Sequence, residues 1–197
     1  MVQNAIQEKR MKEYFIEATK EILRGEGLRA VSVRNIAEKA GYSYATLYNY
    51  FSDIKELIFE CVRDFSSDCE EFIQKKTKNT PQGVERIKEI SKAYSQYFIQ
   101  YPGIFELFFI EKTSDIAGKQ PTLTLINSFF AKQCEADLDY AVRSGQVNAE
   151  VSEQMIETLS NATIGILLNY VFRRQPSNYK AYTKSLKNQI DFILERH

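Results

Sequence analysis

The chain has 197 residues, of which 44% are hydrophobic, and its 26 basic side chains balance 26 acidic ones. This length and hydrophobic content suffice for one large domain or two small ones with a real core, which argues against intrinsic disorder. A net charge of zero excludes nucleic-acid binding through bulk positive charge, although a local basic patch stays possible. Only eight glycines and four prolines argue against a turn-rich β-sandwich or barrel.

The residues on which most enzymes and metal sites depend are scarce. The one histidine is the last residue, His197, and the three cysteines form no CxxC pair. In a helix, Cys61 and Cys69 would lie about 12 Å apart along the axis, which is too far for a disulfide. No glycine-rich phosphate loop or nucleophile elbow is present. We therefore expect no enzymatic activity, no catalytic residue, no cofactor and no metal, and we expect all three thiols, including Cys134, to be reduced and buried.

The chain also lacks the segments that direct a protein to or through a membrane. Met1 to Lys12 has no apolar core of a signal peptide. Eighteen apolar residues run together nowhere, so we expect no spanning helix and a soluble, cytoplasmic protein.

The hydrophobic period of the N-terminal quarter predicts three helices. The first carries apolar residues at i, i+4, i+7 and i+11 and should end at Gly25 and Gly27. The second covers 33–40, with Ser32 as its N-cap and Gly41 as its end. The third covers 44–50, is capped by Ser43 and turns Leu47 inward.

The same period continues through the rest of the chain. A fourth helix starts at Ser52 or Asp53 and runs to about residue 74, and the polar stretch 75–83 is a hinge. A helix over 84–98 ends at the sequence Tyr-Pro-Gly of 101–103. The apolar segment 104–110 should be buried, 113–121 is a loop, and 123–142 is helical. The last two helices cover about 152–174 and about 177 to the C-terminus. The fold class is therefore all-α, with about nine helices.

The segment 32–51 has the pattern of a helix-turn-helix. Two short helices are joined by a tight turn at Gly41, and Ile36, Ala37 and Leu47 supply facing apolar residues. The second helix would then turn polar side chains outward, with its N-terminal end toward a DNA major groove. The alternative is an ordinary hairpin of two helices in a helical protein.

The residues of this segment resemble the tetracycline-repressor (TetR) family of bacterial regulators over about residues 8–60. The resemblance is carried by Gly27, Ser32, Val33, Ile36, Ala37, Ala40, Gly41, Ser43, Thr46, Leu47, Tyr48, Tyr50, Phe51, Lys55 and Leu57. It implies a DNA-binding domain at 1–52, with the motif at 32–51, and a helical effector-binding and dimerisation domain at 53–197. The helix at 53–74 would connect the two domains.

The candidate DNA contacts follow from chemistry and from this resemblance. Tyr44 opens the second helix of the motif and is the candidate for a base edge or a thymine methyl, while Thr46 and Asn49 can hydrogen bond there. Tyr48 matches the family position whose hydroxyl reaches a phosphate. Lys55 lies in the first turn of the fourth helix, where the helix dipole disfavours a cation unless an anion binds there. The complete candidate set is Ser32, Arg34, Ser43, Tyr44, Thr46, Tyr48, Asn49, Tyr50 and Lys55.

Two features temper this reading. Tyr42 and Tyr50 could instead be scaffold residues that pack between helices, and Lys55 could lie on a solvated surface. No lysine or arginine occurs from Ser43 to Phe51, so the usual bidentate recognition of guanine is missing from this helix. We expect few phosphate contacts, a shallow salt dependence, and specificity from Tyr, Thr and Asn contacts and DNA shape.

The C-terminal helices suggest a dimer and an effector site. The resemblance implies that the last two helices pair with those of a second copy across a two-fold axis. The alternative is that they pack on the chain's own core. The candidate interface, with Gly165 allowing close approach, consists of Ile156, Leu159, Thr163, Ile166, Leu167, Tyr170, Leu186, Ile190 and Ile193. The candidate pocket consists of Tyr94, Phe98, Phe105, Phe108, Phe109, Phe129 and Phe130, and Tyr140 adds to the aromatic character of these helices. Such a lining favours an apolar or aromatic ligand. The alternative is ordinary core, which an aromatic stripe at helical spacing more often forms.

The resulting hypothesis is a homodimeric, ligand-responsive transcriptional regulator. Its partners would be a double-stranded DNA operator, a small-molecule effector and a second copy of the chain, with no membrane. In this family the regulator is most often a repressor, released from a palindromic operator when the ligand makes the fourth helix swing. The alternative is a helical small-molecule-binding protein that no longer binds DNA.

Overall fold

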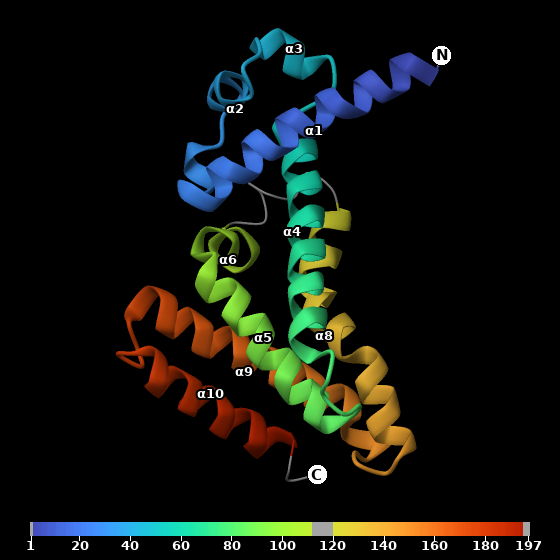
Figure 1. The fold of residues 1–197 in the computed structure, drawn as a ribbon. Coiled ribbons are helices and arrows are strands. Elements are labelled where there is room, and N and C mark those ends of the chain that lie inside the picture. Colours follow the sequence, from blue (N-terminus) through green and yellow to red (C-terminus); the bar gives the residue numbers. More distant parts are fainter. Residues whose placement is uncertain (1, 112–119, 195–197) are drawn as a thin grey trace. The chain divides into compact units, whose positions relative to one another are not determined.

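The computed structural model describes residues 2–111 and 120–194. Over these residues the chain forms nine α-helices and one short 3-10 helix, and no strand occurs in them (Figure 1). None of the described helices is long and apolar enough to cross a bilayer. The expected all-α class with about nine helices, an N-terminal helix-turn-helix and a C-terminal helical region is confirmed.

The chain divides into two compact units. The first comprises Met1–Ser67 and Tyr101–Ile126, and the second comprises Asp68–Gln100 and Asn127–His197. The division falls inside two long helices, α4 (Ile54–Thr77) and α8 (Gln120–Arg143), so each of them contributes to both units. The units therefore do not coincide with the expected domains 1–52 and 53–197, which stay a functional prediction.

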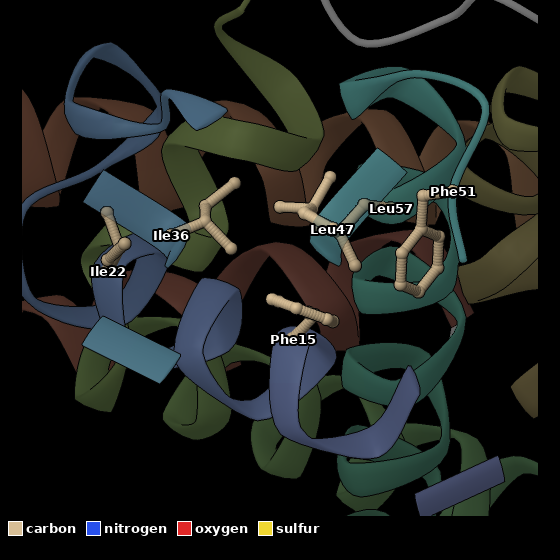
Figure 2. Packing of buried hydrophobic residues seen from close by; sticks show 6 residues of the cluster. All are labelled: Phe15, Ile22, Ile36, Leu47, Phe51 and Leu57. Carbon is tan, nitrogen blue, oxygen red and sulfur yellow. The ribbon is translucent and has the colours of Figure 1, made fainter. Parts of the chain in front are cut away.

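The first unit is built around α1 (Val2–Gly25), the 3-10 helix η1 (Leu28–Ala30), α2 (Val33–Ala40) and α3 (Tyr44–Tyr48). Helices α1 and α3 both contact α2. Figure 2 shows six apolar side chains gathered between these helices and the start of α4. The cluster consists of Phe15, Ile22, Ile36, Leu47, Phe51 and Leu57. Their burial is the main hydrophobic contribution to the position of α2 and α3 on α1.

The helix ends in this unit follow local chemistry, with two differences from expectation. The backbone of Gly41 adopts φ +76°, in the left-handed region, and ends α2 as predicted. Gly25, in contrast, is the last residue of α1, and the positive φ of +77° belongs to Gly27. Helix α3 ends at Tyr48 instead of the predicted residue 50. The chain tightens there, since the Tyr50 amide donates to the Leu47 carbonyl oxygen three residues back (3.0 Å).

Ser52 and Asp53, the two residues predicted to begin the fourth helix, both take part in hydrogen bonds at the start of α4. The Asp53 side chain accepts a hydrogen bond from the Glu56 amide (2.7 Å), so Asp53 is the N-cap. The Glu56 carboxylate in turn accepts from the Ser52 amide (2.9 Å) and the Ser52 hydroxyl (2.7 Å). This reciprocal pattern satisfies amides that the helix itself leaves unpaired.

The remaining part of the first unit is α6 (Pro102–Phe109), which packs against α1. Proline stands at its first position, where a missing N–H costs nothing. Ile104, Phe105, Leu107 and Phe108 are buried as expected. The expected burial of the whole segment 104–110 is wrong for Ile110, which is 41% exposed because α6 has already ended there. The expected loop 113–121 lies mostly outside the described residues, and its last two residues belong to α8.

The second unit contains α5 (Val84–Gln100), α9 (Ala149–Arg173), α10 (Tyr179–Leu194) and the adjoining parts of α4 and α8. Helices α9 and α10 pack against each other and against α5 (Figure 1). The expectation that 75–83 is a hinge between two regions is wrong, because residues 75–77 end α4 and the whole stretch lies inside the second unit. The buried Asp137 carboxylate of α8 accepts a hydrogen bond from the Gly83 amide (2.9 Å).

Candidate nucleic-acid interface

Two serine caps position the candidate motif. The Ser32 hydroxyl accepts a hydrogen bond from the Asn35 amide (3.1 Å) at the start of α2. The Ser43 hydroxyl accepts from the Thr46 amide (3.1 Å) at the start of α3. Ser43 and Thr46 also share a hydrogen bond between their hydroxyl oxygens (2.9 Å). The cap therefore fixes both the beginning of α3 and the direction of the Thr46 side chain.

The core beneath the motif decides which side of α3 faces out. Leu47 is fully buried against Phe15 in the six-residue cluster. Because α3 is one and a half turns long, burying this residue turns its neighbours to the surface. Tyr44 is 67% exposed and Tyr48 is 53% exposed, and Asn49 is also exposed. These are hydroxyl, amide and aromatic groups with few partners in their own chain.

The other candidates lie around this face in different degrees of exposure. Ser43 and Arg34 are exposed, while Ser32, Thr46, Tyr50 and Lys55 are partly buried. The Tyr50 ring centroid lies 6.2 Å from that of Phe15, and the Tyr42 ring lies 5.6 Å from it. These two tyrosines thus have the scaffold contacts that the sequence left open, and Tyr50 retains a partly exposed edge.

Positive charge near the motif is limited. Arg29 and Arg34 are exposed, and Lys55 lies in the first turn of α4. The Lys39 ammonium pairs with the Glu21 carboxylate at 3.0 Å, so its charge is partly neutralised. The site consequently offers few cations for a phosphate backbone.

One residue of the motif was missed by the sequence analysis. The Asn35 side-chain amide donates to the Ala30 carbonyl oxygen (2.8 Å) while its backbone amide serves the Ser32 cap. Asn35 thereby ties η1 to the first turn of α2. An asparagine in the first turn of a capped helix was the available signal, because such side chains often bond to nearby backbone.

The candidate effector residues are divided between the two units. Phe105, Phe108 and Phe109 belong to the first unit, whereas the others belong to the second. In the second unit the rings of Phe98, Phe129 and Phe130 surround Tyr94, with centroids at 4.9, 6.0 and 5.1 Å. All four of these residues are buried. Tyr140 is partly exposed on α8. The region around Tyr94 is therefore packed aromatic core in this structure.

The candidate dimer residues require a correction. Ile156, Leu159, Thr163, Ile166 and Leu167 of α9 are buried within the chain itself. The same holds for Leu186, Ile190 and Ile193 of α10. Tyr170 is partly buried, with its ring 4.5 Å from that of Tyr182. The apolar face identified from periodicity is therefore the face that packs on the chain's own core, which was the alternative. A contact with a second copy would have to use the opposite sides of these helices.

The cysteines show no sign of a reactive site. Cys61, Cys69 and Cys134 are free and buried, and burial raises the pKa of each thiol well above its ordinary value. Such thiols stay protonated and react slowly. Within residues 2–111 and 120–194, no group of three or more histidine, cysteine or acidic side chains could hold a metal ion.

Comparisons with known proteins agree with this geometry. The model of the family "bacterial regulatory proteins, tetR family" matches residues 15–61, from the second half of α1 to the first third of α4. A search of the curated proteins finds no significant match.

Solved structures match nearly the whole chain. The fatty acid degradation regulator FadR of Bacillus halodurans is 14% identical over 94% of this chain and 96% of its own, with a TM-score of 0.73. FadR of Bacillus subtilis, in complex with stearoyl-CoA, is 13% identical over 92% and 97%, with a TM-score of 0.72. A TetR family transcription regulator of Marinobacter aquaeolei is 19% identical over 99% and 97%, with a TM-score of 0.64. At these identities the similarity shows a common fold.

Proposed function

We propose that this protein is a dimeric repressor, which a small molecule releases from a palindromic operator. Residues 15–61 match the tetR-family model, and the chain has the fold of solved regulators of that family. The observation that carries the proposal is the exposed face of α3. Ser43 caps this helix and Leu47 anchors it, which leaves Tyr44, Tyr48 and Asn49 exposed and Thr46 partly exposed.

The proposed contacts divide into two kinds. Tyr44, Thr46 and Asn49 read base edges in the major groove, because their hydroxyl, methyl and amide groups match what bases present there. The Tyr48 hydroxyl, Ser32, Arg34 and Lys55 hold the phosphate backbone, with Ser43 and Tyr50 at the margin of the contact. Lys55 adds a cation in the first turn of α4, next to the Asp53 cap of that helix.

The test is binding of duplexes selected from a random library, measured by fluorescence anisotropy. Thr46→Ala and Tyr44→Ala should each weaken binding by about tenfold, since a good base contact contributes about 1–3 kcal/mol. Tyr140→Ala, which removes a partly exposed tyrosine of α8, is the matched control and should bind normally. The proposal fails if no duplex is selected, or if the α3 variants bind as the control does.

Salt gives a second, independent measurement of the same site. Few cations surround the motif, so the logarithm of affinity should fall only shallowly with the logarithm of salt concentration. A slope as steep as that of a strongly basic DNA-binding protein would show that phosphate contacts dominate, against the proposal.

For the dimer, we assign the outer sides of α9 and α10. Each helix has a stripe at i, i+4, i+7 and i+11 whose members are exposed or partly exposed and which ends in an exposed phenylalanine. The stripes are Asn161, Gly165, Leu168 and Phe172 on α9, and Ala181, Ser185, Asn188 and Phe192 on α10. A methyl group built on Gly165 would meet no atom within 4 Å, so a neighbouring helix has room to approach.

The dimer assignment predicts the effect of one charge. Leu168→Arg should give a folded monomer in sedimentation at micromolar concentration, because an unpaired cation buried between two copies costs several kcal/mol. Ala136→Arg, on the exposed side of α8, should leave the dimer intact. A wild-type monomer, or a Leu168→Arg dimer, would contradict the assignment.

For the effector, we propose an apolar ligand that enters the aromatic region around Tyr94. The rings there are packed together, so a ligand must select a minor, opened state, and this selection would drive release from DNA. A long-chain acyl-CoA is the first probe, because the similar Bacillus subtilis FadR was solved with stearoyl-CoA.

The measurement is a thermal-unfolding series with and without operator DNA. At a hundredfold excess over its dissociation constant, a ligand adds about 2.7 kcal/mol to stability. In a chain of this size that raises Tm by about 5–10 °C. Free coenzyme A, which lacks the acyl chain, is the control: it should not release DNA, and the acyl-CoA should raise Tm beyond any shift that coenzyme A gives. An acyl-CoA that leaves both Tm and DNA binding unchanged would refute this ligand class.

A further inference from the structure

A surface groove in the second unit lies between α5 and α10, away from the aromatic core around Tyr94. Its volume is about 390 Å³, which is within the range of small-molecule sites. Four lysines line it: Lys92 of α5, and Lys180, Lys184 and Lys187 of α10. Its apolar wall includes Tyr179, Tyr182 and Leu186, and no carboxylate is among the lining residues.

Up to Asp191, α10 carries only positive charges. Lys180, Lys184 and Lys187 all precede Asp191, which is the first acidic residue of the helix. Lys180 lies in the first turn, where the positive N-terminal end of a helix disfavours a cation. Lys92 and Lys187 have carboxylate partners at 2.6 Å, Glu89 and Asp191. Within residues 2–111 and 120–194, no carboxylate comes within ion-pair distance of Lys180 or Lys184.

Tyr182 lines the groove with a side chain that is only 1% exposed. Its hydroxyl lies beside the Ser95 hydroxyl of α5, which itself donates to the Ser91 carbonyl oxygen (2.9 Å). The polar end of Tyr182 is therefore held inside the second unit, and its ring supplies apolar surface to the groove.

The groove also offers an aromatic surface. The Tyr179 ring is nearly parallel to that of Tyr182, with centroids 6.2 Å apart and an interplanar angle of 24°. Tyr179 is partly exposed, and the Gln96 side-chain amide donates to its hydroxyl (3.3 Å). This bond holds the ring at the edge of the groove, where a planar group could stack on it.

We propose that this groove binds a nucleotide-type anion, that is, a small molecule with an aromatic base and one or more phosphates. The lysines of α10 and Lys92 bind the phosphates, and the base stacks on Tyr179. The site is separate from the DNA-reading face and from the aromatic region proposed for the effector, and its occupancy does not depend on either.

The experiment is isothermal titration of the full chain, without DNA, using ATP, adenosine and inorganic tripolyphosphate. ATP should bind, and adenosine and tripolyphosphate should each bind at least tenfold more weakly, because each retains only half of the recognised chemistry. Lys180→Gln combined with Lys184→Gln should weaken ATP binding by at least tenfold. Lys75→Gln combined with Lys78→Gln, two exposed lysines at the end of α4 and just after it, is the matched control and should bind ATP normally.

Absence of ATP binding at 1 mM, by order of magnitude the weakest affinity of interest, would overturn the proposal. Equal binding of tripolyphosphate and ATP would overturn the stacking. Equal loss in the control lysine variant, or tighter binding of a glutamate decapeptide than of ATP, would show a general anion-binding or protein-binding surface and would also overturn it.

Discussion

The Ser43 cap allows a quantitative test of how α3 is prepared for DNA. Helix α3 has only five residues, and Ser43 satisfies the Thr46 amide while its hydroxyl also bonds to the Thr46 hydroxyl. Replacing Ser43 with alanine removes both bonds. Loss of such a cap costs about 0.5–2 kcal/mol of helix stability.

The expected consequence is a loss of DNA affinity of the same size. DNA binding requires the capped form of α3 with Thr46 in this rotamer. In the free Ser43→Ala protein this form is higher in free energy, and the difference is lost from the binding free energy. A cost of one to two kcal/mol corresponds to a roughly 5–30-fold weaker dissociation constant. Ser43→Thr keeps a hydroxyl at the cap and should recover most of the affinity.

The assay is fluorescence anisotropy with a selected operator duplex, accompanied by urea unfolding. Asn148→Ala is the control, because the Asn148 side chain caps α9 by accepting from the Glu150 amide (3.0 Å), away from the motif. It should lower stability by a similar amount and leave DNA affinity unchanged. Ser43→Ala binding within twofold of wild type would refute the reasoning. So would an equal affinity loss in Asn148→Ala, since the effect would then be one of general stability.

Three further predictions concern packing, charge and the thiols. Gly103→Ala should destabilise the protein by about 1–3 kcal/mol in urea unfolding, because the new methyl would lie 2.5 Å from the Leu23 carbonyl oxygen; a stability equal to wild type would contradict the α1–α6 contact. Asp64→Asn should cost about 1 kcal/mol, because the Lys20 side chain, 8% exposed, loses a carboxylate at 3.3 Å but keeps that of Glu17 at 3.0 Å. A cost no larger than that of Glu71→Gln, which breaks an exposed ion pair of α4, would refute this reasoning. Burial raises the pKa of the three thiols, so they should stay protonated and resist Ellman's reagent at pH 8 until urea unfolds the chain; rapid labelling of the native protein would be the contrary result. These thiols are Cys61, Cys69 and Cys134.

The parts of the fold that depend on neighbouring residues could be predicted from the sequence. The limits of α2 were correct to the residue, because Ser32 and Gly41 act on amides and carbonyls within one turn. The predicted end of α3 was wrong by two residues. The last turn tightens to hydrogen bonds between residues three apart, and no residue type in the sequence indicates this change. Ile110 was expected to be buried from its apolar context, yet it lies beyond the end of α6 and is exposed.

The choice of partner for an apolar face could not be predicted. Periodicity correctly identified the apolar sides of α9 and α10, but it cannot tell the chain's own core from a second copy, and the structure packs these sides on α5. The aromatic residues present the same difficulty, since a ring buried in core and a ring lining a pocket have the same spacing along a helix.

The amino-acid sequence by itself determined the helical class, the capped motif and its exposed polar face, because these follow from periodicity and from contacts within a few residues. Only the tertiary structure decided which groups separated along the chain meet. It packs aromatic rings around Tyr94 and places Lys92 of α5 beside the lysines of α10. It also brings the Gly83 amide, at the end of the 75–83 stretch, into a hydrogen bond with Asp137. Such contacts depend on how whole helices pack, and packing is decided by the fit of many side chains at once rather than by any local pattern.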